Sequence, residues 1–461
     1  MHAAAVLVAA VAAVLQAPAN ADRQLAHDVL KQLVEIDTTT DTVGTERAAR
    51  AMEERLLAAG FSHDDVQVMG ADAKHSNVLI RLRGRSSQKP IVLMAHLDVV
   101  PARPEDWSVP PFSFTERDGY FYGRGVADDK QGDANIVTNM IRWKRDGWVP
   151  ARDVIAVLTS DEETGGTTIR WMIDHVPALR DADLALNADS GAGDLVDGKR
   201  TLLNVQVSEK VYADYRLTAT DKGGHSSRPR NADNPIYRLS QALDRLAAYQ
   251  FPVHLNDATR TYFEQDAALR TPAIGADMKA LAAGTASPEA MARLSADPQF
   301  NAFMRTTCVA TMIEGGHAPN ALPQMARVNV NCRILPQDNP SEVQQKLEEI
   351  FRPAKAELEV ATAPKESPAS PLRPDVMKAI QEAAAKHFPG VMVLPQMEAG
   401  ATDGLYMRKA GVPVYGIKAE FDDPADVRAH GRDERLPAAS YYDAVEFWHD
   451  LVPMLATGKG K

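Results

Sequence analysis

The sequence predicts an α/β fold in which a sheet domain carries an inserted ferredoxin-like α+β domain. Continuous apolar runs such as Ile91–Ala95 and Val154–Leu158 are typical of strands buried on both faces, and segments of helical periodicity alternate with them. From about residue 204 to 363 the predicted order is instead β-α-β-β-α-β, the order of a ferredoxin-like fold. The sheet pattern then returns, and a length of 461 residues suits two domains.

Local patterns predict the elements of the sheet domain. Leu25, Val29 and Leu33 recur at helical spacing, which predicts a helix over Asp22–Glu35. A second helix is expected over Thr45–Ala59, with the threonine as N-cap and a glycine directly after the last residue. The remaining elements expected are strands at Val66–Val68 and Asn77–Leu82, a helix at Asp133–Trp143, an apolar run from Leu184, a helix at Pro374–His387, a strand at Val412–Ile417 and a helix at Ser440–Leu455.

The inserted domain is recognised because its strands alternate between apolar and polar residues. The expected elements are strands at Val205–Thr218, Thr307–Glu314, Arg327–Leu335 and Leu358–Ala361, and helices at Asn234–Tyr249 and Ser341–Phe351. An insertion near 251–304 has helical patterns, and the sequence indicates no chemical role for it. The predicted organisation is 1–21 signal peptide, 22–206 first part of the catalytic domain, 207–363 inserted domain and 364–461 second part of the catalytic domain.

Residues 1–21 are apolar and rich in alanine, and they end in overlapping small-x-small sites at Ala17–Ala19 and Ala19–Ala21. This pattern predicts a cleaved secretory signal, although His2 stands where Lys or Arg is usual. The alternative is a retained anchor, but the apolar run is shorter than the roughly 20 residues that a spanning helix needs. We therefore expect a periplasmic or secreted protein that is not an integral membrane protein after cleavage.

Composition limits the partners and the covalent framework. The 51 Lys and Arg residues against 62 Asp and Glu residues give a net charge of −11, which makes nucleic acid and anionic membrane surfaces unfavourable partners. Cys308 and Cys332 are the two cysteines of the sequence. One disulfide after export and two unpaired core cysteines are both compatible with this count.

Ionisable side chains follow the ends of the predicted strands. His96 and Asp98 end the first apolar run, Glu162 and Glu163 follow the second, and Asp189 follows a third. Adjacent acids at a strand end are costly unless a positive charge lies among them, and a metal ion supplies that charge. Because open α/β sheets place their sites at the carboxyl ends of strands, we expect these side chains to gather at one edge.

Glycine-rich loops supply further candidates. The segment from Gly119 to Gly125 leads to Asp128 and Asp129 before a helix, but the order G-x-x-x-x-G-K-[ST] of a phosphate-binding loop is absent. His225 lies in a second glycine-flanked loop, and His430 in a polar loop near the end of the chain offers another imidazole.

These segments together resemble the family of dizinc peptidases and deacylases that includes aminoacylase, carnosinase, acetylornithine deacetylase, succinyl-diaminopimelate desuccinylase and carboxypeptidase S (peptidase family M-20). The segments that carry the resemblance are H-L-D-V-V-P, G-R-G-V-A-D-D-K, S-D-E-E-T-G-G, N-A-D-S-G, G-G-H-S-S-R-P, A-T-D-G and A-H-G-R-D-E. The W-S-V-P-P-F segment and the long inserted domain most resemble the carboxypeptidase S branch.

The resemblance implies a role for each motif residue. Asp128 would bridge two zinc ions, with His96 and Asp189 on one and Glu163 and His430 on the other. Glu162 would be the general base, Asp98 would orient the ligand histidine, and Asp129 would follow the bridging aspartate through a cis peptide. The remaining implied roles are oxyanion stabilisation by His225 on a lid/dimerisation domain, and substrate-carboxylate binding by Asn320, Arg333 and Gly400.

The implied function is a secreted dizinc metallohydrolase of the metallocarboxypeptidase or dipeptidase type, in which a hydroxide held between the zinc ions attacks an amide bond next to a free carboxylate. Cobalt or manganese could replace zinc, because ligand type does not distinguish them. An N-acyl-amino-acid deacylase, an esterase or lactonase, and a catalytically silent peptide-binding protein are the alternatives. The substrate side chain and the choice between a monomer and a homodimer stay open.

Overall fold

The computed structural model describes residues 20–40, 42–70, 72 and 74–457. The predicted signal peptide therefore lies outside the described residues except for Asn20 and Ala21. The described residues form two compact units: unit 1 contains those up to Gln206, Ser370–Leu394 and those from Thr402 onward, and unit 2 contains Val207–Ala369 and Pro395–Ala401. No helix among the described residues combines the length and apolar character needed to cross a bilayer.

Unit 1 contains a large mixed sheet, which confirms the α/β prediction. Its strand order is β1-β2-β6-β3-β7-β17-β9-β8-β18, with β16 also paired to β9. The strands are β1 Val66–Met69, β2 Asn77–Leu82, β3 Ile91–His96, β6 Val154–Thr159, β7 Leu184–Asn187, β8 Gly193–Val196, β9 Lys199–Glu209, β16 Met392–Glu398, β17 Val414–Gly416 and β18 Phe421–Asp422. β3 runs parallel to both β6 and β7, whereas β2 is antiparallel to β6.

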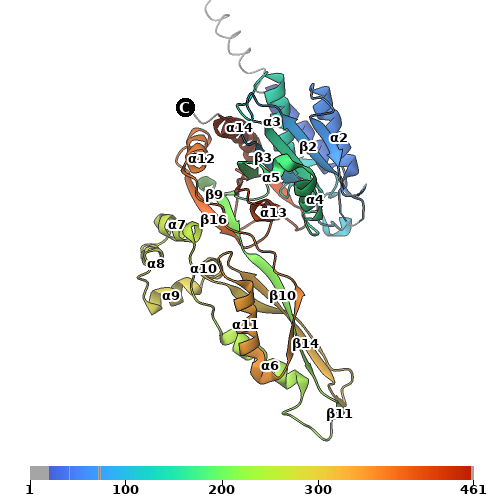
Figure 1. Cartoon of the computed structure of the whole chain (residues 1–461), viewed down its shortest axis with the longest axis vertical. Helices are drawn as coiled ribbons and strands as arrows, with labels where there is room; N and C mark the ends of the chain where they lie inside the picture. The colour runs from blue at the N-terminus through green and yellow to red at the C-terminus, as the bar shows by residue number, and fades with distance from the viewer. Residues whose placement is uncertain (1–19, 41, 71, 73, 458–461) are drawn as a thin grey trace, which may run out of the picture. The chain divides into compact units, whose positions relative to one another are not determined.

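Helices cover both faces of the central strands, which explains why those strands are continuously apolar. α3 (Lys130–Arg145) packs against β3 and beside α14 (Ala438–Leu455) in Figure 1. Val92 and Met94 pack in a cluster with residues of α4 (Thr167–His175) and α13 (Gly404–Lys409). The other helices of this unit are residues 20–34, α2 Glu46–Ala58, η1 Pro104–Asp106, α5 Pro177–Arg180 and α12 Pro374–His387.

Two local expectations for unit 1 were wrong. Thr45 does not cap α2 with its side chain; its Oγ1 instead donates to the main-chain oxygen of Ser76 at 2.9 Å. The helix predicted from Asp133 begins at Lys130, directly after the loop that carries the two aspartates. A small sheet of β4 (Thr115–Arg117), β5 (Tyr120–Tyr122) and β19 (Arg435–Pro437) also went unpredicted, because its strands are too short for a periodic signal.

Unit 2 has the predicted β-α-β-β-α-β order. Its elements are β10 Val211–Thr220, α6 Pro235–Ala248, β12 Thr307–Gly315, β14 Met325–Ile334, α11 Pro340–Phe351, η3 Arg352–Ala354 and β15 Glu357–Thr362. The strand predicted at Val205–Thr218 is in fact two strands, β9 and β10, interrupted at Lys210. Cys308 and Cys332 are directly opposed on β12 and β14 and form a disulfide.

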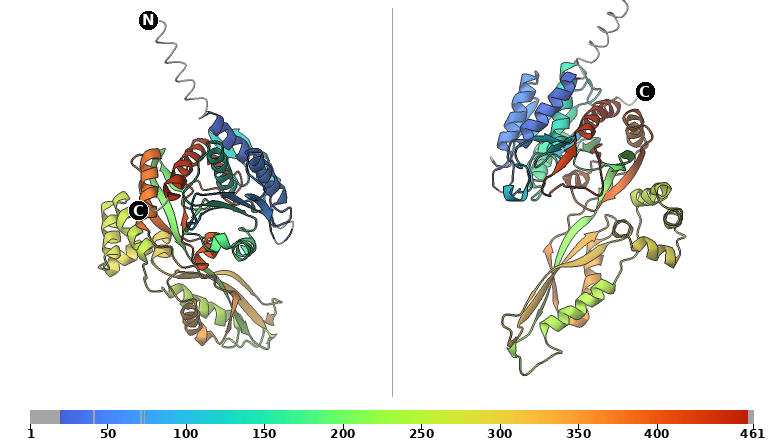
Figure 2. Two further views of the ribbon diagram at one scale, coloured as in Figure 1. Left: turned by 45° about the horizontal axis from the view of Figure 1, so that its top comes forward. Right: turned by 180° about the vertical axis from the view of Figure 1, so that it is seen from behind.

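The insertion of unit 2 is helical, as the sequence indicates. It consists of α7 Asp257–Asp266, η2 Ala267–Leu269, α8 Pro272–Ala282, α9 Pro288–Ser295 and α10 Pro298–Met304. Figure 2 shows these helices, coloured yellow to olive, as a group of their own. The side chains of Ser287 and Asp297 cap α9 and α10.

Candidate active site

The carboxyl ends of three parallel strands bring the predicted polar residues of unit 1 together. His96 is the last residue of β3 and lies beside Thr159, the last residue of β6. The turn after β6 carries Glu162 and Glu163, and the turn after β7 carries Asp189. The strand ends therefore deliver one imidazole and three carboxylates to the same edge of the sheet.

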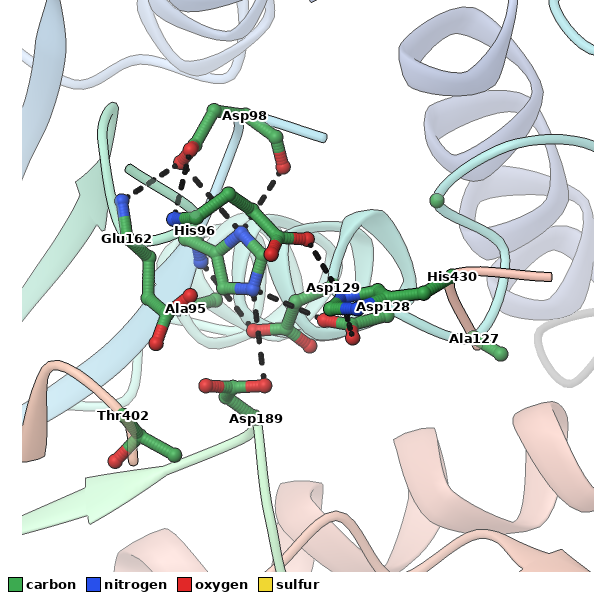
Figure 3. Close-up of polar contacts among 12 residues, drawn as sticks. Ala95, His96, Asp98, Ala127, Asp128, Asp129, Glu162, Asp189, Thr402 and His430 are labelled. Carbon is green, nitrogen blue, oxygen red and sulfur yellow. Dashed lines mark hydrogen bonds and ion pairs between the residues drawn. The ribbon is translucent and has the colours of Figure 1, made fainter. Parts of the chain in front are cut away.

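The imidazole of His96 lies among carboxylates on both sides (Figure 3). Its Nε2 is 3.1 Å from Oδ1 of Asp128 and 3.7 Å from Oδ1 of Asp189. Its Nδ1 is 3.0 Å from the main-chain oxygen of Asp98. The ring is buried, so its orientation is fixed by these contacts.

The second imidazole approaches the same aspartate from the other side. His430 Nε2 lies 3.0 Å from Oδ2 of Asp128 and 3.0 Å from Oε1 of Glu163. The two oxygens of Asp128 therefore face two different histidines. A carboxylate in this position is arranged to bridge two metal ions.

The candidate ligands form two groups that share Asp128. Within each group the potential ligand atoms lie within 4.8 Å of one another: His96, Asp128 and Asp189 in one, and Asp128, Glu163 and His430 in the other. Each group has one imidazole nitrogen and carboxylate oxygens, a donor set that suits zinc, manganese or cobalt. The residues present therefore fit a pair of divalent ions.

Asp98 links the ligand histidine to the turn that carries the glutamates. Its buried carboxylate accepts hydrogen bonds from the main-chain N–H groups of Glu162 and Glu163 at 3.2 and 3.1 Å, and from Thr40 Oγ1 at 2.9 Å. Its Oδ1 is 3.6 Å from His96 Nδ1, farther than its own main-chain oxygen. The side chain of Asp98 thus fixes the glutamate turn more directly than it fixes the imidazole.

Asp129 lies beside the ligand groups but belongs to neither of them. The Asp128–Asp129 peptide bond is cis, as the resemblance implies. The buried carboxylate of Asp129 accepts hydrogen bonds from Gln131 Nε2 at 2.9 Å and from the main-chain N–H of His96 at 3.3 Å. It therefore ties the loop after Gly125 to the end of β3.

The electrostatics of the site favour protonated imidazoles before metal binds. Hydrogen bonds to Asp128 and Glu163 raise the pKa of His430 to about 10. Burial opposes a charge on His96, but the carboxylates of Asp128, Asp189 and Asp98 around its ring raise the pKa of His96 well above its usual range. A bound metal takes the place of these protons, so metal affinity increases with pH.

Glu162 is partly buried next to the ligand groups without belonging to either of them. Burial, followed by the nearby charge of Asp189, raises the pKa of Glu162 well above its usual range. A carboxylate with a raised pKa can both accept and return a proton near neutral pH.

The other predicted site residues lie in unit 2 and form two pairs. His225 is on β11 (Gly224–His225), which pairs with β13 (Ala321–Leu322), directly after Asn320. Arg333 on β14 donates from Nη1 to the main-chain oxygen of Ala399, the residue before Gly400, at 3.0 Å.

The tautomer of His225 follows from its neighbour. The main-chain N–H of Ser227 donates to His225 Nδ1 at 3.2 Å. Because Nδ1 accepts this bond, the neutral ring carries its proton on Nε2. The Nε2–H group is thus the hydrogen-bond donor of this side chain.

Sequence reasoning missed a buried ion pair behind the ligands. Glu434 Oε1 accepts from the main-chain N–H groups of Gly125 and Ala127 at 3.1 and 2.8 Å, and its Oε2 accepts from Arg124 Nη1 at 2.5 Å. Arg124 Nη2 also donates to the main-chain oxygen of Gly431 at 3.1 Å. Both side chains stand inside recognised motifs, but their spacing of 310 residues gives no local signal that they pair.

Comparisons with known proteins extend over most of the chain. The family model described as "Peptidase family M20/M25/M40" matches residues 92–453. N-fatty-acyl-amino acid synthase/hydrolase PM20D1 of Homo sapiens is 29% identical over 377 residues, which cover 79% of this chain and 74% of that protein. Probable carboxypeptidase S-like 2 of Dictyostelium discoideum is 26% identical over 378 residues, which cover 79% of this chain and 72% of that protein. The crystal structure of the M20 family metallo-carboxypeptidase Sso-CP2 from Sulfolobus solfataricus matches with a TM-score of 0.69 at 18% identity, over 94% of this chain and 99% of that one.

Proposed function

The chain belongs to peptidase family M20/M25/M40 and is a hydrolytic enzyme, and from this premise we propose that it cleaves an amide bond next to a free carboxylate. The observation that carries the proposal is the position of Asp128, whose two oxygens lie 3.1 and 3.0 Å from the Nε2 atoms of His96 and His430. This arrangement supports a centre of two divalent ions. We propose zinc as the resident metal, with cobalt or manganese as substitutes.

The protein groups around this centre have separate tasks. Two divalent ions, when bound, polarise the amide carbonyl and acidify the attacking water. Glu162 takes a proton from that water at its carboxylate and delivers it to the leaving nitrogen. Asp98 holds the main chain of the glutamate turn, so that Glu162 and its neighbour Glu163 keep their positions.

Unit 2 is proposed to supply substrate recognition. The Nε2–H group of His225 is a suitable donor to the oxyanion that develops during attack. Arg333 lies with its guanidinium 4.7 Å from the ring centre of Tyr212 and donates to Ala399, contacts that orient it for a substrate carboxylate. Asn320 and Gly400 complete the proposed binding residues.

The substrate class has two candidates. We propose a carboxypeptidase or dipeptidase activity, in keeping with the carboxypeptidase S-like relative. The second candidate is hydrolysis of N-acyl amino acids, which is favoured by the similarity to the N-fatty-acyl-amino acid synthase/hydrolase. Both substrates place a free carboxylate beside the scissile amide, so the same residues serve either reaction.

A paired-substrate assay tests this proposal. The metal-loaded mature protein is offered dipeptides with free carboxyl termini, the same dipeptides amidated, and N-acyl amino acids. We expect turnover of at least one carboxylate series and its loss on amidation. Equal cleavage of amidated and free substrates would contradict carboxylate recognition, and the ratio of peptide to acyl turnover decides between the two candidates.

We further propose that the protein is exported, on the basis of the apolar leader of residues 1–21. Mass spectrometry of the protein from its native cell should give an amino terminus near Asp22. An intact leader on cytosolic protein would contradict this.

A further inference from the structure

Arg305, which directly follows α10, carries a buried positive charge without a carboxylate partner among the described residues. Arg305 has 5% of its surface exposed to solvent. Nη1 donates to Gln250 Oε1 at 2.6 Å and Nη2 donates to Ser295 Oγ at 3.1 Å, and both partners are neutral. Nε has no hydrogen-bond partner. A guanidinium in this setting keeps its charge, and none of the hydrogen-bond partners found for it among the described residues neutralises that charge.

Three other buried arginines of the chain each have a carboxylate partner. Arg124, Arg142 and Arg152 are 2%, 6% and 5% exposed, comparable to Arg305. Each contacts a carboxylate, at 2.5, 2.9 and 2.7 Å respectively. Arg305 therefore differs from these three arginines in its partners.

Arg305 lines a groove of about 670 Å³ in unit 2. The groove also has Phe251 and Val253, from the segment after α6, and Met291 and Ala292, from α9, in its lining. Arg305 is the one charged residue of this lining, and no carboxylate belongs to it. The volume is within the range of about 300–1,000 Å³ that small-molecule sites have.

Lys210 lies next to the main chain of Arg305. Lys210 Nζ donates to the main-chain oxygen of Arg305 at 2.8 Å and lies 3.3 Å from Thr307 Oγ1. Lys210 is fully buried, and the charge of Asp338 lies near it. The charged group at this end of the groove is the guanidinium of Arg305.

We infer that this groove of the helical insertion is a binding site for an aliphatic monocarboxylate, with the carboxylate on Arg305 and the hydrocarbon chain along Phe251, Val253 and Met291. A single guanidinium balances the charge of one carboxylate, whereas a doubly charged phosphate would leave one negative charge uncompensated in this lining. The apolar lining favours a ligand with an apolar chain over a small hydrophilic acid. The inference concerns residues of unit 2 alone and does not depend on the proposed reaction.

Calorimetric titration of the full-length mature protein, loaded with metal, tests the inference. Sodium dodecanoate below its micellar concentration is the probe, and dodecanol, acetate and inorganic phosphate are the comparison ligands. We expect saturable binding of dodecanoate, with acetate, phosphate and dodecanol each weaker by about tenfold or more, because each lacks the chain or the charge.

Two variants place the ligand in the groove. Arg305→Gln removes the charge, and Ala292→Glu adds a repelling carboxylate to the lining of the groove; each should weaken dodecanoate binding about tenfold or more. Ala283→Glu is the matched control, because Ala283 is exposed at the end of α8 and outside the lining, and it should bind as the wild type does.

Circular dichroism checks that each variant is folded. If Arg305→Gln does not fold, dodecanoate binding by Ala292→Glu decides the test. Dodecanoate binding that is absent from the wild type, or that persists unchanged in Ala292→Glu, would overturn the inference. Unchanged binding in that variant would assign the fatty acid to another site, such as the metal centre. Phosphate binding as tight as that of dodecanoate would also overturn it.

Discussion

The buried pair of Arg124 and Glu434 is predicted to hold one of the two metal sites in place. The pair connects the main chain before Asp128 with the main chain after His430, because Glu434 binds two N–H groups of the first segment and Arg124 binds an oxygen of the second. These segments carry two of the three ligands of the Asp128, Glu163 and His430 group. Loosening the pair should therefore affect that group more than the other.

Glu434→Gln is the perturbation of choice because it keeps the size of the side chain and removes the charge. Arg124 is then left as a buried cation without its partner, which typically costs about 3–5 kcal/mol. For a unit of this size the loss lowers Tm by roughly 6–20 °C. Loss of a group that orients metal ligands also reduces metal affinity by about 10–100-fold.

The assay measures metal content and affinity separately from activity. Dialysed protein is analysed for bound metal, and metal-free protein is titrated calorimetrically. Wild-type protein should bind two ions tightly, whereas Glu434→Gln should keep one and bind the other about 10–100-fold more weakly. Asp183→Asn is the matched control, since it breaks the Asp183–Arg152 pair at 2.7 Å within unit 1 without touching the ligands. If both variants lose similar stability and both keep two tight ions, the pair has no metal-positioning role.

Three further predictions concern other parts of the chain. Glu162→Gln should keep both metal ions and reduce kcat by about 10²–10⁴-fold, because it removes the proton carrier; turnover near the wild-type rate would contradict this role. Leu93→Ala, in the fully buried β3, should lower the free energy of unfolding, measured by urea denaturation, by about 2–5 kcal/mol. A smaller loss would indicate that neighbouring side chains move into the cavity that the substitution leaves. Burial, assisted by Arg333 and opposed by Asp338, lowers the pKa of Lys210 to about 7 from its ordinary value of 10.5. Between these values the unfolded chain binds more protons, so wild-type stability relative to Lys210→Met should rise with pH across that window, and parallel pH profiles would refute this.

The sequence predicts well wherever a pattern is local. The apolar runs of β3 and β6 identify buried strands, and His96 and Thr159 end these strands side by side at the edge that the polar residues predict. Periodicity also predicts the order of elements in unit 2, since each strand and helix there is long enough to repeat its pattern. The motif segments identify the family, and the family model matches residues 92–453.

Local patterns fail where the main chain bends or where a side chain binds a distant segment. The continuous pattern of Val205–Thr218 hides the interruption at Lys210, because alternation in the side chains continues across a break in the main-chain pairing. Thr45 has the residue type of a cap, but its hydroxyl donates to the main-chain oxygen of Ser76, the residue before β2. The short strands β4, β5 and β19 are stabilised by pairing with one another, and they are too short to show a periodic pattern in the sequence.

The sequence by itself thus determined the kinds of elements, the donor atoms available to a metal and the strand ends on which most of them stand. Only the tertiary structure decided that the two oxygens of Asp128 face different histidines, that Glu434 binds the loop before this aspartate, and that the buried Arg305 donates to neutral side chains. The physical reason is that hydrogen bonds and ion pairs act over a few ångströms in space. Residues hundreds of positions apart come within that range only when strand pairing and helix packing have set the path of the main chain.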